Sequence, residues 1–141
     1  GGQHRNKVEP AVVVKHLPTG IEGQASERRS QEANRKMAIR RLRMNLAVEA
    51  RRPVDARQGP SLLWSSRCHR GRIGVSAQHE DFPAILAEAL DVIFGQDADL
   101  PAAAKRLGCT GSQLARLVKT EPRAWALFNQ ERNRRGLRPL K

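Results

Sequence analysis

The chain has 141 residues, enough for one ordinary domain or two small ones. Only 4% of them are aromatic and none is Tyr, so any hydrophobic core must be aliphatic and modest. No apolar run approaches the roughly 20 residues that a membrane-spanning helix needs. The net charge of +12 favours a polyanionic partner, with nucleic acid preferred over an anionic membrane surface. The two cysteines, Cys68 and Cys109, suggest no disulfide framework and favour a reducing cytoplasm.

The first expected unit is α+β and covers residues 1–50. We expect this unit to be truncated at its N-terminus, because the sequence begins without Met. The short β-branched run Ala11–His16 favours a strand. The turn residues Pro18-Thr19-Gly20 separate it from a weaker strand over Ile21–Ala25, and the pattern therefore predicts a β-hairpin.

A long helix is predicted next, from Glu27 or Ser30 to Ala50, because this stretch lacks Gly and Pro and because Pro53 follows it. One apolar face of the helix should pack on the hairpin, and it consists of Ile39, Leu42, Leu46 and Ala50. A basic flank consists of Arg29, Lys36, Arg40 and Arg43. Such a flank is either a solvated surface or a phosphate contact, and the net charge favours the second.

Residues 51–80 mix Arg, Gly, Pro and Ser without periodicity, which predicts a basic linker. Its one apolar cluster is Leu62-Leu63-Trp64. Trp64 and Trp125 are both candidates for stacking on bases. Trp125 lies at helical spacing from Phe128, which favours a place in the core instead.

Residues 81–141 are predicted to form an all-α unit of four helices. Each boundary has Asp, Ser, Thr or Glu at the start, with Gly after the end in most cases. Asp81 and Asp99 are expected to cap the first two helices. The four predicted helices run from about Phe82 to Phe94, from Pro101 to Gly108, from Thr110 or Ser112 to Lys119, and from Thr120 or Glu121 to near Gly136.

A helix-turn-helix pattern lies within this unit, with Ala104, Gly108, Leu114 and Leu117 at the offsets that such a pair uses. One interpretation places residues 112–119 in a groove of DNA. The other takes the same pattern as the packing of a small helical bundle, which aids ribosome binding or tethers a partner. The second interpretation is preferred.

The first three residues, Gly1-Gly2-Gln3, carry a possible chemistry. Two glycines remove the side chains from a stretch of backbone and open φ values that other residues avoid. Such a loop can bring N–H donors to the oxyanion that develops when an ester is hydrolysed. The amide side chain of Gln3 can hold or exclude water. Hydrolysis by this loop would depend on positioning and electrostatics, without a covalent nucleophile.

A longer pattern surrounds this motif. It comprises Gly1-Gly2-Gln3-His4-Arg5-Asn6-Lys7, Ala11-Val12, His16-Leu17-Pro18-Thr19-Gly20-Ile21, Arg29-Ser30-Gln31 and Asn34-Arg35, followed by Ala38 and Leu42. Over roughly residues 1–47, this pattern resembles the catalytic domain of class I peptide chain release factors. It is equally similar to that domain in stand-alone factors that rescue stalled ribosomes.

The resemblance implies ribosome-dependent hydrolysis of peptidyl-tRNA by an enzyme of the peptidyl-tRNA hydrolase type. It implies that Gly1 and Gly2 permit the loop conformation, and that Gln3 offers its backbone amide to the oxyanion and orders water. Gln3 is also a candidate for N-methylation. The residues that it implies to support the loop or to meet ribosomal RNA are Asn6, Lys7, Arg29, Gln31, Asn34 and Arg35, and the basic flank adds Lys36, Arg40 and Arg43.

The sequence departs from the family pattern at Val8, where the family usually has Thr, and at Pro10, where it usually has Ser. His4 is either a general base or a loop residue that packs or contacts RNA, and the second is favoured. Cys68, His69 and His79 lack the spacing of a metal site, so we expect neither metal nor cofactor.

The leading hypothesis is therefore a monomeric, cytoplasmic rescue factor that acts on the ribosome, with ribosomal RNA and peptidyl-tRNA as partners and no membrane. Codon-independent action is favoured, because no segment resembles a codon-reading domain. The second hypothesis is a non-enzymatic nucleic-acid-binding protein that uses the helix-turn-helix-like unit at residues 81–141.

Overall fold

The computed structural model describes residues 11–141, so Gly1 to Pro10 lie outside the described residues. Contacts within the chain divide it into two compact units, residues 1–50 and residues 51–141. Helices and small antiparallel sheets both occur, which confirms the α+β class. Within residues 11–141, no helix combines the length and the apolar character needed to cross a bilayer.

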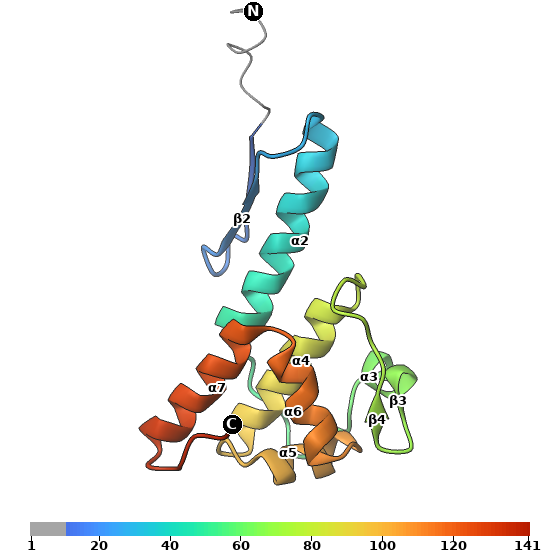
Figure 1. Ribbon diagram of the computed structural model, residues 1–141, viewed down its shortest axis with the longest axis vertical. Helices are drawn as coiled ribbons and strands as arrows, with labels where there is room; N and C mark the ends of the chain where they lie inside the picture. Colours follow the sequence, from blue (N-terminus) through green and yellow to red (C-terminus); the bar gives the residue numbers. More distant parts are fainter. Residues whose placement is uncertain (1–10) are drawn as a thin grey trace, which may run out of the picture. The chain divides into compact units, whose positions relative to one another are not determined.

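The first unit is a β-hairpin on a long helix (Figure 1). Strands β1 (Val12–Lys15) and β2 (Glu22–Ala25) pair antiparallel, and helix α2 (Gln31–Glu49) packs against both. Gly20 has a φ of 75° and donates its N–H to the carbonyl of His16 at 2.7 Å, which closes the turn. The predicted hairpin and helix are confirmed.

Gly23 of β2 sets how closely the hairpin approaches α2. A Cβ atom at this position would lie 2.2 Å from the carbonyl oxygen of Ala38 and 2.3 Å from the amide nitrogen of Leu42. Only a hydrogen in place of a side chain fits there, so β2 rests directly on the helix backbone.

The face of α2 that meets the hairpin differs from the predicted apolar face. Leu42 is buried as expected, but Ile39, Leu46 and Ala50 are only half-buried. Asn34 and Ala38 are fully buried instead. The difference between the predicted and the observed buried face has a physical cause. The close approach at Gly23 requires a small residue opposite it on α2, and this residue is Ala38.

The second unit starts with a strap, residues 51–61, which is tied down by polar contacts. The backbone N–H of Arg52 donates to Asp91 at 3.0 Å, and that of Ser61 donates to Glu88 at 2.8 Å. Between these anchors, the Arg106 guanidinium donates to the carbonyls of Asp55 and Gln58. Burial raises the pKa of Asp91 against the opposing effect of the backbone N–H and the nearby arginines.

The stretch after the strap contains three short elements, where the sequence predicted a linker. They are α3 (Leu62–Arg67), β3 (Cys68–His69) and β4 (Arg72–Ile73). Trp64 is fully buried and donates its indole N–H to the carbonyl of Leu107 at 2.8 Å. Tertiary contacts of this kind, and not local periodicity, order the stretch.

Four helices complete the second unit, as predicted: α4 (Phe82–Gly95), α5 (Leu100–Leu107), α6 (Gly111–Lys119) and α7 (Pro122–Arg134). Asp99 caps α5 and Thr110 caps α6 through their side chains, which satisfies orphan N–H groups. The expected cap at Asp81 is wrong. Its carboxylate binds the guanidinium of Arg67 at 2.9 Å instead of an N–H of α4.

The core of the second unit is built around α4, which contacts α3, α5, α6 and α7 (Figure 1). Its largest fully buried apolar side chains come from all these elements except α5: Trp64, Phe82, Ile85, Leu86, Leu90, Ile93, Leu114, Val118 and Phe128. Full burial of one such side chain contributes roughly 1.5–3 kcal/mol. The helical unit therefore has a substantial core of its own.

Candidate nucleic-acid interface

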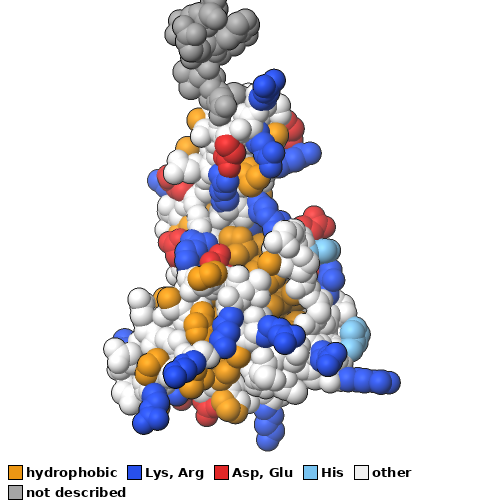
Figure 2. All heavy atoms as spheres, viewed as in Figure 1, with side chains coloured by type: hydrophobic (Ala, Val, Ile, Leu, Met, Phe, Trp, Pro, Cys, Tyr) orange, Lys and Arg blue, Asp and Glu red, His pale blue; other side chains and the backbone are white. Residues whose placement is uncertain are grey.

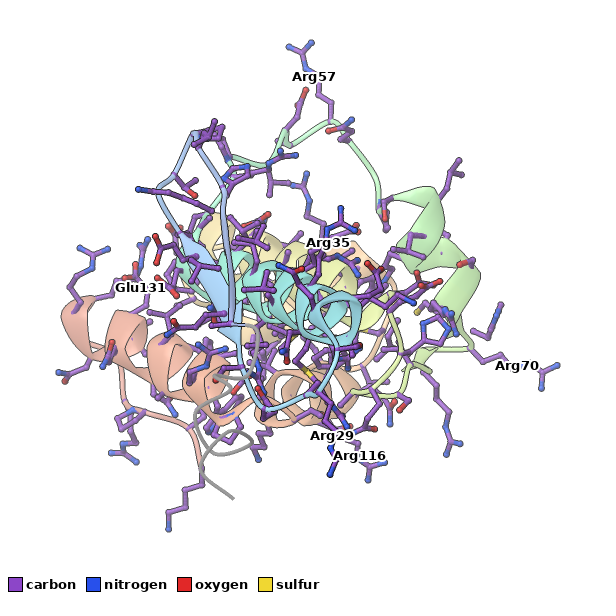
Figure 3. All side chains as sticks on the ribbon, turned by 90° about the horizontal axis from the view of Figure 1, so that it is seen from above. Arg29, Arg35, Arg57, Arg70, Arg116 and Glu131 are labelled. Carbon is purple, nitrogen blue, oxygen red and sulfur yellow. The ribbon has the colours of Figure 1, made fainter. Side chains whose placement is uncertain are left out.

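The described site residues lie just before α2 and along its first two thirds. Gly1, Gly2, Gln3, Asn6 and Lys7 lie outside the described residues. The others divide by exposure: Arg29, Gln31, Arg35 and Lys36 are exposed, Arg40 and Arg43 are half-exposed, and Asn34 is buried. We call Arg29, Arg35, Lys36, Arg40 and Arg43 the α2 cations. Figure 3 shows Arg29 and Arg35 leaving different sides of the helix start, whereas Lys36, Arg40 and Arg43 recur at the spacing of one helix face.

Asn34 fixes the loop that leads into α2. Its Oδ1 accepts the backbone N–H of Arg28 at 2.9 Å, and its Nδ2 donates to the carbonyl of the same residue at 3.0 Å. Ser30 caps the helix by accepting the N–H of Ala33 at 3.0 Å. The side chain of Asn34 is thus an internal brace beneath the exposed Arg29, and its full burial keeps it from direct contact with a ligand.

Arg41 and Glu27 form a second brace, which the sequence reasoning missed. The Arg41 guanidinium binds both carboxylate oxygens of Glu27 and donates to the carbonyl of Gln24 at 2.9 Å. The hydrogen bond from Arg41, together with backbone N–H groups, lowers the pKa of Glu27 to about 2. This pair joins the loop, β2 and α2. The two residues are 14 positions apart, so no helical spacing could have revealed them.

A shallow hollow of about 320 Å³ lies beside Arg41, at the end of the hairpin where residue 11 begins. Its titratable groups are Glu27 and Arg41, which bind each other. Over residues 11–141, no group of three His, Cys, Asp or Glu side chains is placed to hold a metal ion. The described part of this unit therefore serves as a scaffold with a basic surface.

The two tryptophans differ in their environment. Trp64 belongs to the core, where its ring is inaccessible to a base. Trp125 is half-buried, its ring centroid lies 5.0 Å from that of Phe128, and the ammonium group of Lys119 lies 4.8 Å above it. One face of Trp125 is thus occupied by a cation–π contact within the unit.

Comparison with known proteins agrees with the architecture of the first unit. The model of the "RF-1 domain" matches residues 1–78. Peptide chain release factor 1 of Xylella fastidiosa is 46% identical over 56 residues, which cover 40% of this chain and 15% of that protein. Peptide chain release factor 2 of Acidovorax sp. is 46% identical over 59 residues, or 41% of this chain and 16% of the relative.

A plant relative matches a segment of similar length. The chloroplastic peptide chain release factor PrfB1 of Arabidopsis thaliana is 50% identical over 50 residues, which cover 36% of this chain and 11% of that protein. The chain thus spans only about a sixth or less of the length of these curated relatives. No solved structure matches the chain significantly. The RF-1 domain model, however, accounts for residues 1–78 of 141, more than half of the sequence, and the chain belongs to the RF-1 domain family.

Proposed function

We propose that this chain promotes hydrolysis of the peptidyl-tRNA ester on the ribosome and so releases the nascent peptide. The observation that carries the proposal is the RF-1 domain match over residues 1–78, which includes Gly1-Gly2-Gln3. The relatives are named as peptide chain release factors, which agrees with this activity.

The proposed chemistry is an acyl transfer to water. A water oxygen attacks the ester carbonyl carbon, and negative charge develops on the carbonyl oxygen. The carbonyl then re-forms as the bond to the tRNA ribose oxygen breaks, and the proton lost by the water goes to that ribose oxygen. The backbone N–H of Gln3 stabilises the oxyanion, and its side chain orders the water. Gly1 and Gly2 permit the close approach of the backbone. Gln3 is also the residue that we propose to be N-methylated.

The start of α2 would support this loop and hold the unit on ribosomal RNA. The α2 cations are exposed or half-exposed, and their charge suits phosphate oxygens. Gln31 joins them as a polar contact, with Asn6 and Lys7 nearer to the catalytic loop in the sequence. Asn34 would act from beneath, because its bonds to Arg28 keep the segment that carries Arg29 in place.

We further propose codon-independent rescue of stalled ribosomes by a cytoplasmic monomer. What supports codon independence is that the RF-1 domain match ends at residue 78 and a helical unit follows it at residues 81–141. Within that unit, α5 and α6 would form a helix-turn-helix-like pair, since Gly108 joins them with a φ of 74° and Leu114 and Leu117 are buried. In this proposal, the unit assists binding to the ribosome.

Peptide release from purified ribosomes tests the proposal. Three preparations of ribosomes that carry labelled peptidyl-tRNA are compared. The A site contains no codon in the first, a stop codon in the second and a sense codon in the third. We expect the wild-type chain to release peptide, and Gln3→Ala to lower the rate at least about a hundredfold. Gln130→Ala, at an exposed position of α7, is the matched control and should release peptide at the wild-type rate.

Equal release by wild type and Gln3→Ala would refute the catalytic role. Release only at stop codons would refute codon independence and leave the hydrolysis itself intact. The two parts of the proposal therefore fail separately.

A further inference from the structure

The hairpin of β3 and β4 ends in a turn with an unusual first residue. Cys68 pairs with Ile73 and His69 with Arg72, which leaves Arg70 and Gly71 as a two-residue loop. Their φ values are 53° and 82°, the signature of a type I′ turn. Asn or Gly normally occupies the first position, because a longer side chain at positive φ costs roughly 1 kcal/mol. Arg70 at this position therefore lowers the stability of the turn.

The hairpin tip lies against the start of α6, 40 residues later in the chain. The N–H of Thr110 donates to the carbonyl of Gly71 at 3.0 Å, and Gly71 forms a parallel bridge with Cys109. A Cβ at Gly71 would lie 3.3 Å from the Thr110 side chain, so this junction favours glycine. Arg70 and Arg72 flank the junction, and both are exposed.

Helix α6, which begins at this junction, carries a further exposed cation. Its buried residues are Leu114, Leu117 and Val118, which turns Ser112 and Arg116 outward. A rise of 1.5 Å per residue places Arg116 about 9 Å beyond Thr110 along the helix axis. Arg70, Arg72 and Arg116 form what we call the tip-and-helix cluster.

The cations of this cluster are not neutralised by the described part of the protein. Over residues 11–141, Arg70, Arg72 and Arg116 form no ion pair. Figure 3 shows Arg70 extending away from the unit. On the face shown in Figure 2, Lys and Arg side chains outnumber acidic ones over the helical unit. Arg134 and Arg135 contrast with the cluster, because both bind Glu131, at 2.6 Å and 2.7 Å, and Arg135 also binds Asp97 at 3.0 Å.

We propose that the tip-and-helix cluster binds the phosphate backbone of structured RNA, through Arg70 and Arg72 on the hairpin and Arg116 on α6. Guanidinium groups bind phosphate oxygens through paired hydrogen bonds, and three of them on two adjoining elements can contact separate phosphates of one RNA. The choice of RNA over DNA rests on the function proposed above, which brings the chain to the ribosome. Binding of this kind positions a protein without reading sequence.

The test measures binding of the full chain to a labelled RNA hairpin by fluorescence anisotropy over a series of salt concentrations. The test variant is Arg70→Asn with Arg116→Gln; Asn tolerates positive φ, so the turn is kept. The matched control is Arg134→Gln with Arg135→Gln, which removes the same charge from arginines that are already paired. We expect roughly tenfold weaker binding for the test variant, and a salt dependence reduced by about two released counterions.

We expect the control variant to bind within about twofold of wild type, because its arginines are already neutralised. Thermal melting of each variant establishes that it is folded. Equal weakening by both variants would overturn the inference, since total charge and not the cluster would then govern binding. Tighter binding to a DNA duplex of the same sequence would overturn it as well. Peptide release is measured in parallel. If the wild-type chain releases peptide but the test variant binds RNA as wild type does, the RNA-binding role of the cluster is refuted and the proposed hydrolysis stands. If the test variant binds RNA more weakly but the wild-type chain releases no peptide, the proposed hydrolysis is refuted and the RNA-binding role stands.

Discussion

Replacing Gly23 by Ala should strongly destabilise the first unit and leave the stability of the second one unchanged. The added Cβ would lie 2.2 Å from one backbone atom of α2 and 2.3 Å from another. An ordinary contact needs about 3.4 Å, so β2 and α2 must separate by about 1 Å along most of their shared surface. Overpacking costs typically 1–3 kcal/mol, and the upper end applies here because both obstacles are backbone atoms. We therefore expect a loss of about 3 kcal/mol.

Such a loss is large for a unit of this size. A fold of about 50 residues buries a limited apolar area, and its free energy of unfolding is only a few kcal/mol. A loss of about 3 kcal/mol raises the unfolded population by a factor on the order of a hundred. Hydrogen exchange with mass spectrometry can follow this by segment. Amides of β1, β2 and α2 should lose protection, while amides of α4 should keep it.

Two other glycines provide controls. Gly59→Ala adds a Cβ to open space at an ordinary φ, and stability should change by less than about 0.5 kcal/mol. Gly20→Ala also meets open space but places a side chain at a φ of 75°, which should cost about 1 kcal/mol. If Gly23→Ala were no more destabilising than Gly20→Ala, the close approach of β2 to α2 would be refuted.

Three further predictions concern side chains that hold the fold. Asn34→Ala removes two buried hydrogen bonds and should lower the free energy of unfolding by roughly 2–3 kcal/mol in urea titrations; an effect on RNA binding alone would contradict the bracing role. The lowered pKa of Glu27, about 2 against an ordinary 4.5, means that its pairing with Arg41 stabilises the fold above pH 4.5 and is lost as pH falls towards 2. The difference in melting temperature between wild type and Glu27→Gln should therefore be largest near neutrality and vanish near pH 2; a constant difference would contradict it. Trp64→Phe leaves the buried carbonyl of Leu107 without its donor and should cost about 2 kcal/mol in thermal unfolding, whereas an unchanged melting temperature would place Trp64 outside the core.

The helices of the second unit could be predicted closely because particular residue types mark where they begin and end. Asp99, Gly108 and Thr110 start or end helices through their own side chains or backbone conformations, which a local pattern reveals. The prediction at Asp81 failed because a distant residue, Arg67, competes for the same carboxylate. Local sequence carries no information about such a partner.

The stretch from residue 51 to residue 80 lacked any usable periodicity because its elements are too short to show one. The six-residue helix α3 depends on long-range contacts, among them the bond from Trp64 to Leu107 and the ion pair of Arg67 with Asp81. One signal was available in retrospect: Arg70-Gly71 between two short segments has the length of a type I′ loop, although Asn-Gly would have marked it more clearly.

In the first unit, too, the sequence predicted the elements better than the contacts between them. Its family could be predicted from the motif, and the hairpin and helix from composition. The contact face could not, because a buried Asn34 and a small Ala38 do not look like an apolar stripe. The position of Gly23 explains the burial of Ala38, and the hydrogen bonds to the backbone of Arg28 explain that of Asn34.

The strap at residues 51–61 has a consequence for labelling the protein. Its two ends are anchored independently, at Asp91 and at Glu88, while Arg57 projects from its exposed tip (Figure 3). Lengthening an exposed loop between fixed ends costs only about 0.6 kcal/mol per doubling of its length. A short reporter peptide inserted beside Arg57 should therefore be accommodated at a modest cost, which includes loosening the contacts of Arg106 with Asp55 and Gln58. The tip thus offers a place for a fluorophore with which the proposed binding to the ribosome can be tested in real time.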